Sequence, residues 1–210
     1  MCGKKESIIG ELRAHVPFTA AGTATGILII LVMIGLNAPA SVSTKLFWVM
    51  HPSHVLLSAL VTTGMYRLHG GRGVWSILWI GWLGSVGVAT LSDCIIPFVG
   101  EWLLDMPNRG LHIGFIDKWW LVNPLALAGI ALGAWRPRTK IFHAAHVLVS
   151  TWASLFHITM AMGGPPGALV ILAIGGFLFL AVWVPCCTSD IVFPLLFEKA
   201  GASVKKKKET

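Results

Sequence analysis

Residues 51–59 read HPSHVLLSA and residues 143–151 read HAAHVLVST, so one histidine pattern occurs twice, each time within a long apolar run. The similarity continues in both directions, in the same order: GLNAP (35–39) with GAWRP (133–137), TKLF (44–47) with TKIF (139–142), and SDCIIPFVGE (92–101) with SDIVFPLLFE (189–198). Motifs that recur in one order over about a hundred residues indicate an internal duplication.

The composition is that of a membrane protein. Of the 210 residues, 55% are hydrophobic and 12% charged, whereas about a quarter of a soluble domain is charged. A run of about 20 predominantly apolar residues is long enough to cross a bilayer. Six such runs occur in the chain, at 16–38, 46–66, 75–100, 119–135, 141–162 and 168–197. The sequence therefore predicts an all-α integral membrane protein with six transmembrane helices.

Each copy of the repeat holds three of these runs, which is an odd number. The second copy must then enter the membrane from the opposite side, so we expect two inverted three-helix repeats, an architecture that recurs among transporters. The expected segments are a terminal segment (1–15), the first repeat (16–104), a loop (105–118), the second repeat (119–198) and a basic tail (199–210).

The positive charges predict the orientation. Thirteen of the 16 Lys and Arg residues fall on one side of a six-span topology. That side is expected to be cytoplasmic and to carry both termini, in the plasma membrane of a prokaryote. The net charge of +7 comes mostly from this bias and from the KKKK tail. We therefore expect the tail to meet anionic lipid headgroups rather than nucleic acid. A homo-oligomer is compatible with the sequence.

Polar residues within the apolar runs share one helix face. In the first copy they follow at i, i+3, i+7 and i+11, and the second copy repeats these offsets and extends them to i+14. The first set is His51, His54, Ser58 and Thr62, and the second is His143, His146, Ser150, Ser154 and His157. Such a face is expected to point toward protein or water rather than toward lipid.

Two acids, Asp93 and Asp190, lie deep in apolar runs and at equivalent positions of the repeat. A carboxylate at such depth is costly unless it is paired, and is by default a functional candidate. Lys45 and Glu101 are expected at the outer surface of the membrane. Counted along the helices from these two residues, Asp93 lies at the same depth as His51 and His54. We therefore expect two separate clusters, an outer one of His51, His54 and Asp93 and an inner one of His143, His146 and Asp190.

Two imidazoles and a carboxylate suit a divalent transition metal such as zinc, iron, manganese, cobalt or nickel. Further residues are candidates for additional ligands or for the path of an ion: Ser58, Thr62, Ser92, Glu101, Ser150, Ser154, His157, Cys186, Cys187, Ser189 and Glu198. The sequence thus favours a transporter or channel for a divalent metal.

Three other interpretations remain. A b-type haem protein would use pairs of these histidines as axial ligands. His54 and His146 are expected near opposite faces of the membrane, which weakens this interpretation, but His157 is expected on the outer half of its helix, where it can face His51 or His54. A membrane metalloenzyme with histidine boxes would gather its histidines on one side, whereas the predicted topology divides them. Finally, hydrogen bonds between His and Asp can simply hold two membrane helices together.

Overall fold

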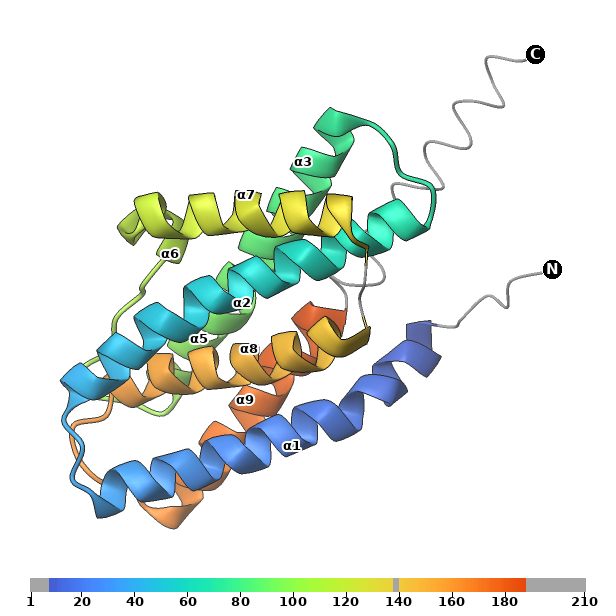
Figure 1. The fold of residues 1–210 in the computed structure, drawn as a ribbon. Coiled ribbons are helices and arrows are strands. Elements are labelled where there is room, and N and C mark those ends of the chain that lie inside the picture. The colour runs from blue at the N-terminus through green and yellow to red at the C-terminus, as the bar shows by residue number, and fades with distance from the viewer. Residues whose placement is uncertain (1–7, 138–139, 188–210) are drawn as a thin grey trace.

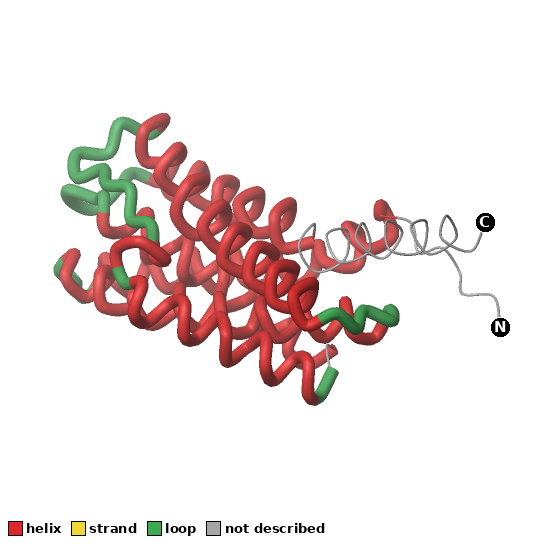
Figure 2. The backbone as a smooth tube through the Cα atoms, turned by 90° about the horizontal axis from the view of Figure 1, so that it is seen from above, coloured by secondary structure: helices red, strands yellow, loops and turns green. Residues whose placement is uncertain are grey.

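The computed structural model describes residues 8–137 and 140–187, and it describes the backbone alone at residues 8–12, 14, 15, 140, 141, 143 and 187. Within this part of the chain the regular structure is entirely helical. The helices lie side by side in one bundle, with the connections gathered at its two ends (Figure 2). The basic tail and its expected lipid contacts lie outside the described residues.

Every apolar run within the described residues forms a helix. Figure 1 shows α2 and α8 through the middle of the bundle, with α1 and α9 on one side and α3 and α7 on the other. The long helices are α1 (Ile8–Gly35), α2 (Ala40–Leu68), α7 (Trp119–Trp135), α8 (Lys140–Met160) and α9 (Ala168–Cys187).

The run expected at 75–100 is one long interrupted helix. Its parts are α3 (Val74–Trp82), the π-helical turn η1 (Leu83–Gly87), α4 (Val88–Thr90), a second π-helical turn η2 (Leu91–Ile95) and α5 (Ile96–Leu103). The short helix α6 (Gly114–Asp117) follows in the connection to α7. A π-helical turn takes one residue more than an α-turn and is frequent at functional sites.

Among the described residues, four helices are long and apolar enough to cross a membrane: Val16–Gly35, Ala40–Leu68, Val74–Leu103 and Ala168–Cys186. Helix α7 is also apolar but shorter. Large apolar side chains such as Leu28, Trp79 and Leu172 are exposed on the outside of the bundle. Because lipid rather than water accepts such a surface, we describe the chain as a membrane protein.

The interior of the bundle is polar where α2, α8 and the interrupted helix meet. Four histidines and two carboxylates are buried there: His51, His54, His146, His157, Asp93 and Glu101. An apolar cluster surrounds them and includes Phe47, Leu155 and Leu178. Buried ionisable groups are expensive and must find partners. The fold thus holds these ionisable side chains inside the protein, where their partners are other buried groups.

Candidate functional site: a buried histidine, carboxylate and thiol cluster

Asp93 lies in the π-helical turn η2 and is completely buried. One of its oxygens, Oδ2, accepts hydrogen bonds from two rings of α2: Nδ1 of His54 at 2.6 Å and Nδ1 of His51 at 2.9 Å. The two histidines are three residues apart, so they lie on one face of α2. The expected contact between these histidines and Asp93 is therefore present.

This arrangement sets the chemistry of both rings. A carboxylate can only accept, so each Nδ1 carries the proton and, in a neutral ring, leaves Nε2 as a lone-pair donor. Nε2 of His51 and Nε2 of His54 are buried and have no hydrogen-bond partner among the described residues. A carboxylate that fixes the tautomer of a ring in this way is the usual second partner of a metal-binding histidine.

The other oxygen of Asp93 is held by hydroxyl groups. Oδ1 accepts hydrogen bonds from Ser92 Oγ at 2.6 Å and from Ser150 Oγ at 3.1 Å, and Ser150 belongs to α8. Ser154, one turn further along α8, donates to the backbone carbonyl of Ser92 at 2.9 Å. Both oxygens of the buried carboxylate are therefore satisfied, and the predicted path residues Ser92, Ser150 and Ser154 hold it in place.

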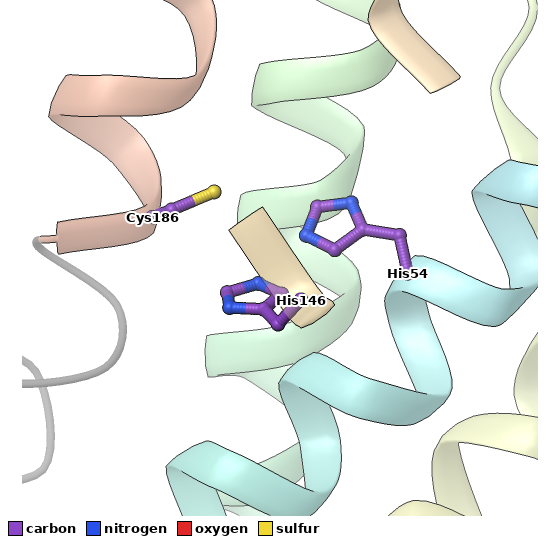
Figure 3. Close-up of side chains that lie close together, drawn as sticks. All are labelled: His54, His146 and Cys186. Carbon is purple, nitrogen blue, oxygen red and sulfur yellow. The ribbon is translucent and has the colours of Figure 1, made fainter. Parts of the chain in front are cut away.

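Three side chains from three helices converge next to this carboxylate. One ring nitrogen of His54 (α2), one of His146 (α8) and the sulfur of Cys186 (α9) lie within 4.8 Å of one another. The two rings stack with centroids 4.7 Å apart, and the Cys186 thiol, which points toward them (Figure 3), donates a hydrogen bond to Ser150 Oγ at 3.5 Å. All three residues are fully buried.

The expectation of two separate clusters is wrong for His54 and His146, which meet in one group. The depth estimate placed the start of the second helix at Lys45, but α2 begins at Ala40, so His54 lies about 21 Å along it. His146 lies equally far, about 21 Å, from Met160 at the other end of the antiparallel α8. A hydrogen bond of 3.0 Å between Thr159 and Ser43 fixes this register.

Glu101 was expected near the surface, but its side chain is only 1% exposed. Its Oε1 accepts a hydrogen bond of 2.7 Å from Nδ1 of His157, and its Oε2 accepts one of 3.2 Å from the backbone of Gly110. The interrupted helix ends at Leu103, and the chain then folds back over Glu101. This returning segment buries the carboxylate of Glu101. The length of the helix alone does not predict such a segment.

His112 is not among the candidates predicted from the sequence, because it lies in a connection between apolar runs. In the structure it is half-buried, and its ring stands edge-on to that of His157 with centroids 5.5 Å apart. Burial lowers the pKa of His112, and the nearby His157 lowers it further, while Asp117 and Glu101 act in the opposite direction.

Among the other candidates, Ser58 and Thr62 are buried on α2, on the face that carries the histidines. The structure describes only the backbone of His143 and Cys187. Ser189, Asp190 and Glu198 lie outside the described residues, so the second acid of the repeat is not placed.

Comparisons of the chain with protein-family models, with curated proteins and with solved structures found no match. The chemistry of the site must therefore be argued from its donor atoms. A thiolate and two imidazoles, with a carboxylate behind one ring, form a ligand set typical of zinc and neighbouring transition metals.

Proposed function

We propose that this protein is a membrane transporter for a divalent transition metal, built from two inverted three-helix repeats. The observation that carries the proposal is the convergence of His54, His146 and Cys186 in the interior of the bundle. Both halves of the chain supply ligands to this one group. An ion held there would contact each half, as an alternating-access mechanism requires.

The positions of His54 and His146 support the repeat. They are the fourth residues of the matching stretches HPSH (51–54) and HAAH (143–146). Two equivalent residues of a two-fold arrangement can contact each other only where the symmetry axis passes between them. The stacked rings at 4.7 Å are therefore the arrangement expected if a pseudo-two-fold axis runs through the site.

Close contacts between helices also fit a pseudo-two-fold relation between the two halves. A Cβ at Gly22 of α1 would meet Thr151 of α8, and a Cβ at Gly129 of α7 would meet Ala59 of α2. Thr151 and Ala59 are equivalent positions of the histidine stretches. Each repeat thus packs its first helix, through a glycine, onto the middle helix of the other repeat.

Other contacts between helices agree with an arrangement in which each repeat packs its first helix onto the middle helix of the other. Helix α2 packs against α3 and α7, while α8 packs against α9 and α1. Helix α3 in turn contacts α7, as α9 contacts α1. If α1, α2 and the interrupted helix correspond to α7, α8 and α9, each of these contacts in one half has its counterpart in the other.

The donor set narrows the class of metal. Cys186, which the sequence suggests only as an additional ligand, adds a thiolate, and thiolate favours zinc, cobalt or iron over manganese. Asp93 would then act through His54, orienting its ring and raising its basicity, instead of binding the ion itself. His51, bonded to the same oxygen, is the candidate for a fourth ligand or for the next site along the path.

A haem protein is less compatible with this geometry. Two axial histidines approach one iron from opposite faces of a porphyrin, which must occupy the space between the rings. The rings of His54 and His146 instead stack on each other at 4.7 Å. A histidine-box metalloenzyme is the stronger alternative, because the structure gathers the histidines that the predicted topology divided.

The test uses cobalt as a spectroscopic substitute for zinc, with the purified full-length protein. A thiolate bound to cobalt(II) gives a charge-transfer absorption that His and carboxylate ligands do not give. We expect this absorption in the wild type and in Cys94→Ala, whose thiol is buried elsewhere in the core. We expect it to be absent in Cys186→Ser.

The same three proteins should then be reconstituted in liposomes. We expect flux of zinc or cobalt in the wild type and in the Cys94→Ala control, and a loss of about 10- to 100-fold in Cys186→Ser. Cobalt binding without any flux would replace the transporter with the metalloenzyme interpretation. No cobalt binding at all would refute the metal site.

A further inference from the structure

A second polar cluster lies at the end of the bundle where the connection 104–113 folds back, and the proposed metal site does not use it. It consists of Glu101, His157 and His112. Glu101 and His157 are almost completely buried. His112 is the only member that is half-exposed, and it lies over the edge of the His157 ring.

We propose that Glu101 and His157 form a proton-binding site that exchanges protons with the solution through His112. His157 donates from Nδ1 to Glu101 Oε1 at 2.7 Å, so its basic atom is Nε2. That Nε2 is buried and has no hydrogen-bond partner among the described residues. A buried lone pair beside a half-exposed imidazole is placed to receive a proton from it.

A proton can move from the solution to Glu101 along these three side chains. His112 takes a proton from water and passes it to Nε2 of His157, while Nδ1 of His157 releases its own proton to Glu101 Oε1. One proton has then moved from the solution to the carboxyl group, and both rings are neutral again. The His157 ring has changed tautomer, and the Glu101 hydroxyl now donates to Nδ1. The 5.5 Å between the two ring centroids can be bridged by a ring rotation or by one water molecule.

The charged and titratable neighbours of this cluster come from several elements. His112 responds to His157 on α8, to Glu101 on α5 and to Asp117 on α6. The nearby cations have partners elsewhere: Arg109 pairs with Asp105 at 3.2 Å, and Lys118 lies over the Trp48 ring. The low pKa of His112 suits a relay, because the ring gives up its proton readily.

Phe47 closes the inner side of this cluster. It is fully buried, stacks nearly parallel to His51 with centroids 5.3 Å apart, and stands edge-on to His157 at 5.3 Å. The apolar ring therefore lies between the proposed proton site and the pair of His51 and Asp93. A proton on Glu101 would be held apart from the metal ligands, and it would reach them only if Phe47 moves.

The test follows protonation of Glu101 in the full-length protein in lipid vesicles, without metal, by time-resolved infrared spectroscopy. After a rapid drop in pH, we expect a protonated-carboxyl band to appear. The band should be absent in Glu101→Gln. In His112→Ala it should appear about 100-fold more slowly, and imidazole added to the solution should restore its rate.

His69→Ala is the matched control, since His69 is an exposed histidine at the end of α2 and bonds only its own helix. It should show the wild-type rate. In His157→Gln the band should be slow and imidazole should not restore it, because that position is buried. An equal rate in His112→Ala and wild type, or a band that persists in Glu101→Gln, would overturn the proposal. Failure of metal transport would leave this test unaffected.

Discussion

At the scale of single residues, the position of Asp93 matters most, because one oxygen serves both histidines of α2. Replacing Asp93 by Asn keeps the shape but removes the negative charge that both rings share. Without this charge the two rings are oriented less firmly and are less basic, so zinc affinity should fall by about 10- to 100-fold. Calorimetric titration with zinc would measure this, and circular dichroism would show that the helices are retained.

The matched control for this variant is Asp105→Asn. Asp105 is 91% exposed and pairs only with Arg109 at the surface, and an exposed ion pair contributes little. Zinc affinity should be unchanged in the control. The same affinity in wild type and Asp93→Asn would mean that the carboxylate only packs the helices.

The sequence indicates most of the individual site residues, but it does not indicate which of them lie together in the structure. Asp93 stands out because it is an acid in an apolar run, and its contact with His51 and His54 follows from helix geometry. Cys186 is less distinctive, since a buried cysteine usually only fills space. Its role becomes visible only once α9 is placed beside α8. His112 carries no signal at all, because its burial depends on how a connection folds.

At the scale of elements, two π-helical turns interrupt the helix that carries Asp93, and Asp93 lies within the second of them. Each turn adds one residue, which shifts the face presented by everything after it. The apolar run at 75–100 predicts a helix and its length, but its hydrophobic pattern does not reveal where an extra residue is inserted. The turn η2 encloses Ser92, Asp93 and Cys94, so the irregular turn coincides with the candidate site.

The contact of α7 with α2 gives a prediction about packing. A methyl group at Gly129 would collide with the backbone carbonyl of Leu56, and backbone cannot move aside cheaply. Gly129→Ala should therefore lower the free energy of unfolding by about 1–3 kcal/mol. Unfolding by denaturing detergent in mixed micelles would measure the loss.

Gly176→Ala is the control, since a Cβ there would meet nothing within 4 Å. It should be neutral or slightly stabilising, because alanine favours helix more than glycine does. If both variants lost stability equally, the close approach of α7 and α2 would be incorrect.

At the scale of the whole molecule, the proposed six spans place both termini in the cytoplasm. Thirteen of 16 positive residues fall on that side. Reporters fused separately to each terminus, one active only in the cytoplasm and one only outside it, should both report the cytoplasm. A third fusion within the connection 104–113 should report the outside. Termini on opposite sides would imply an odd number of spans and exclude the inverted repeat.

The sequence predicts the whole bundle less completely than its helices. Each apolar run yields a helix, because hydrophobicity and length act locally. The packing of the two halves against each other cannot be predicted locally in this way, because it depends on where α2 begins. The sequence places the start of this helix at Lys45, whereas the structure places it five residues earlier, at Ala40. This difference of about 7 Å of helix decides whether His54 and His146 are expected in two separate sites or in the single group that the structure shows.

The stacking of His54 on His146 has a consequence for the ancestry of the chain. If the halves descend from one three-helix protein, each ancestral copy offered a single histidine at the axis. Such a copy could have completed the site only by pairing with a second copy inserted upside down. The ancestor would then have had to enter the membrane in both orientations, and fusion would have made that pairing permanent. Cys186 stands where the first half has Ala89, so in the present chain one half alone supplies the thiol, and the two partners of that pairing are no longer interchangeable.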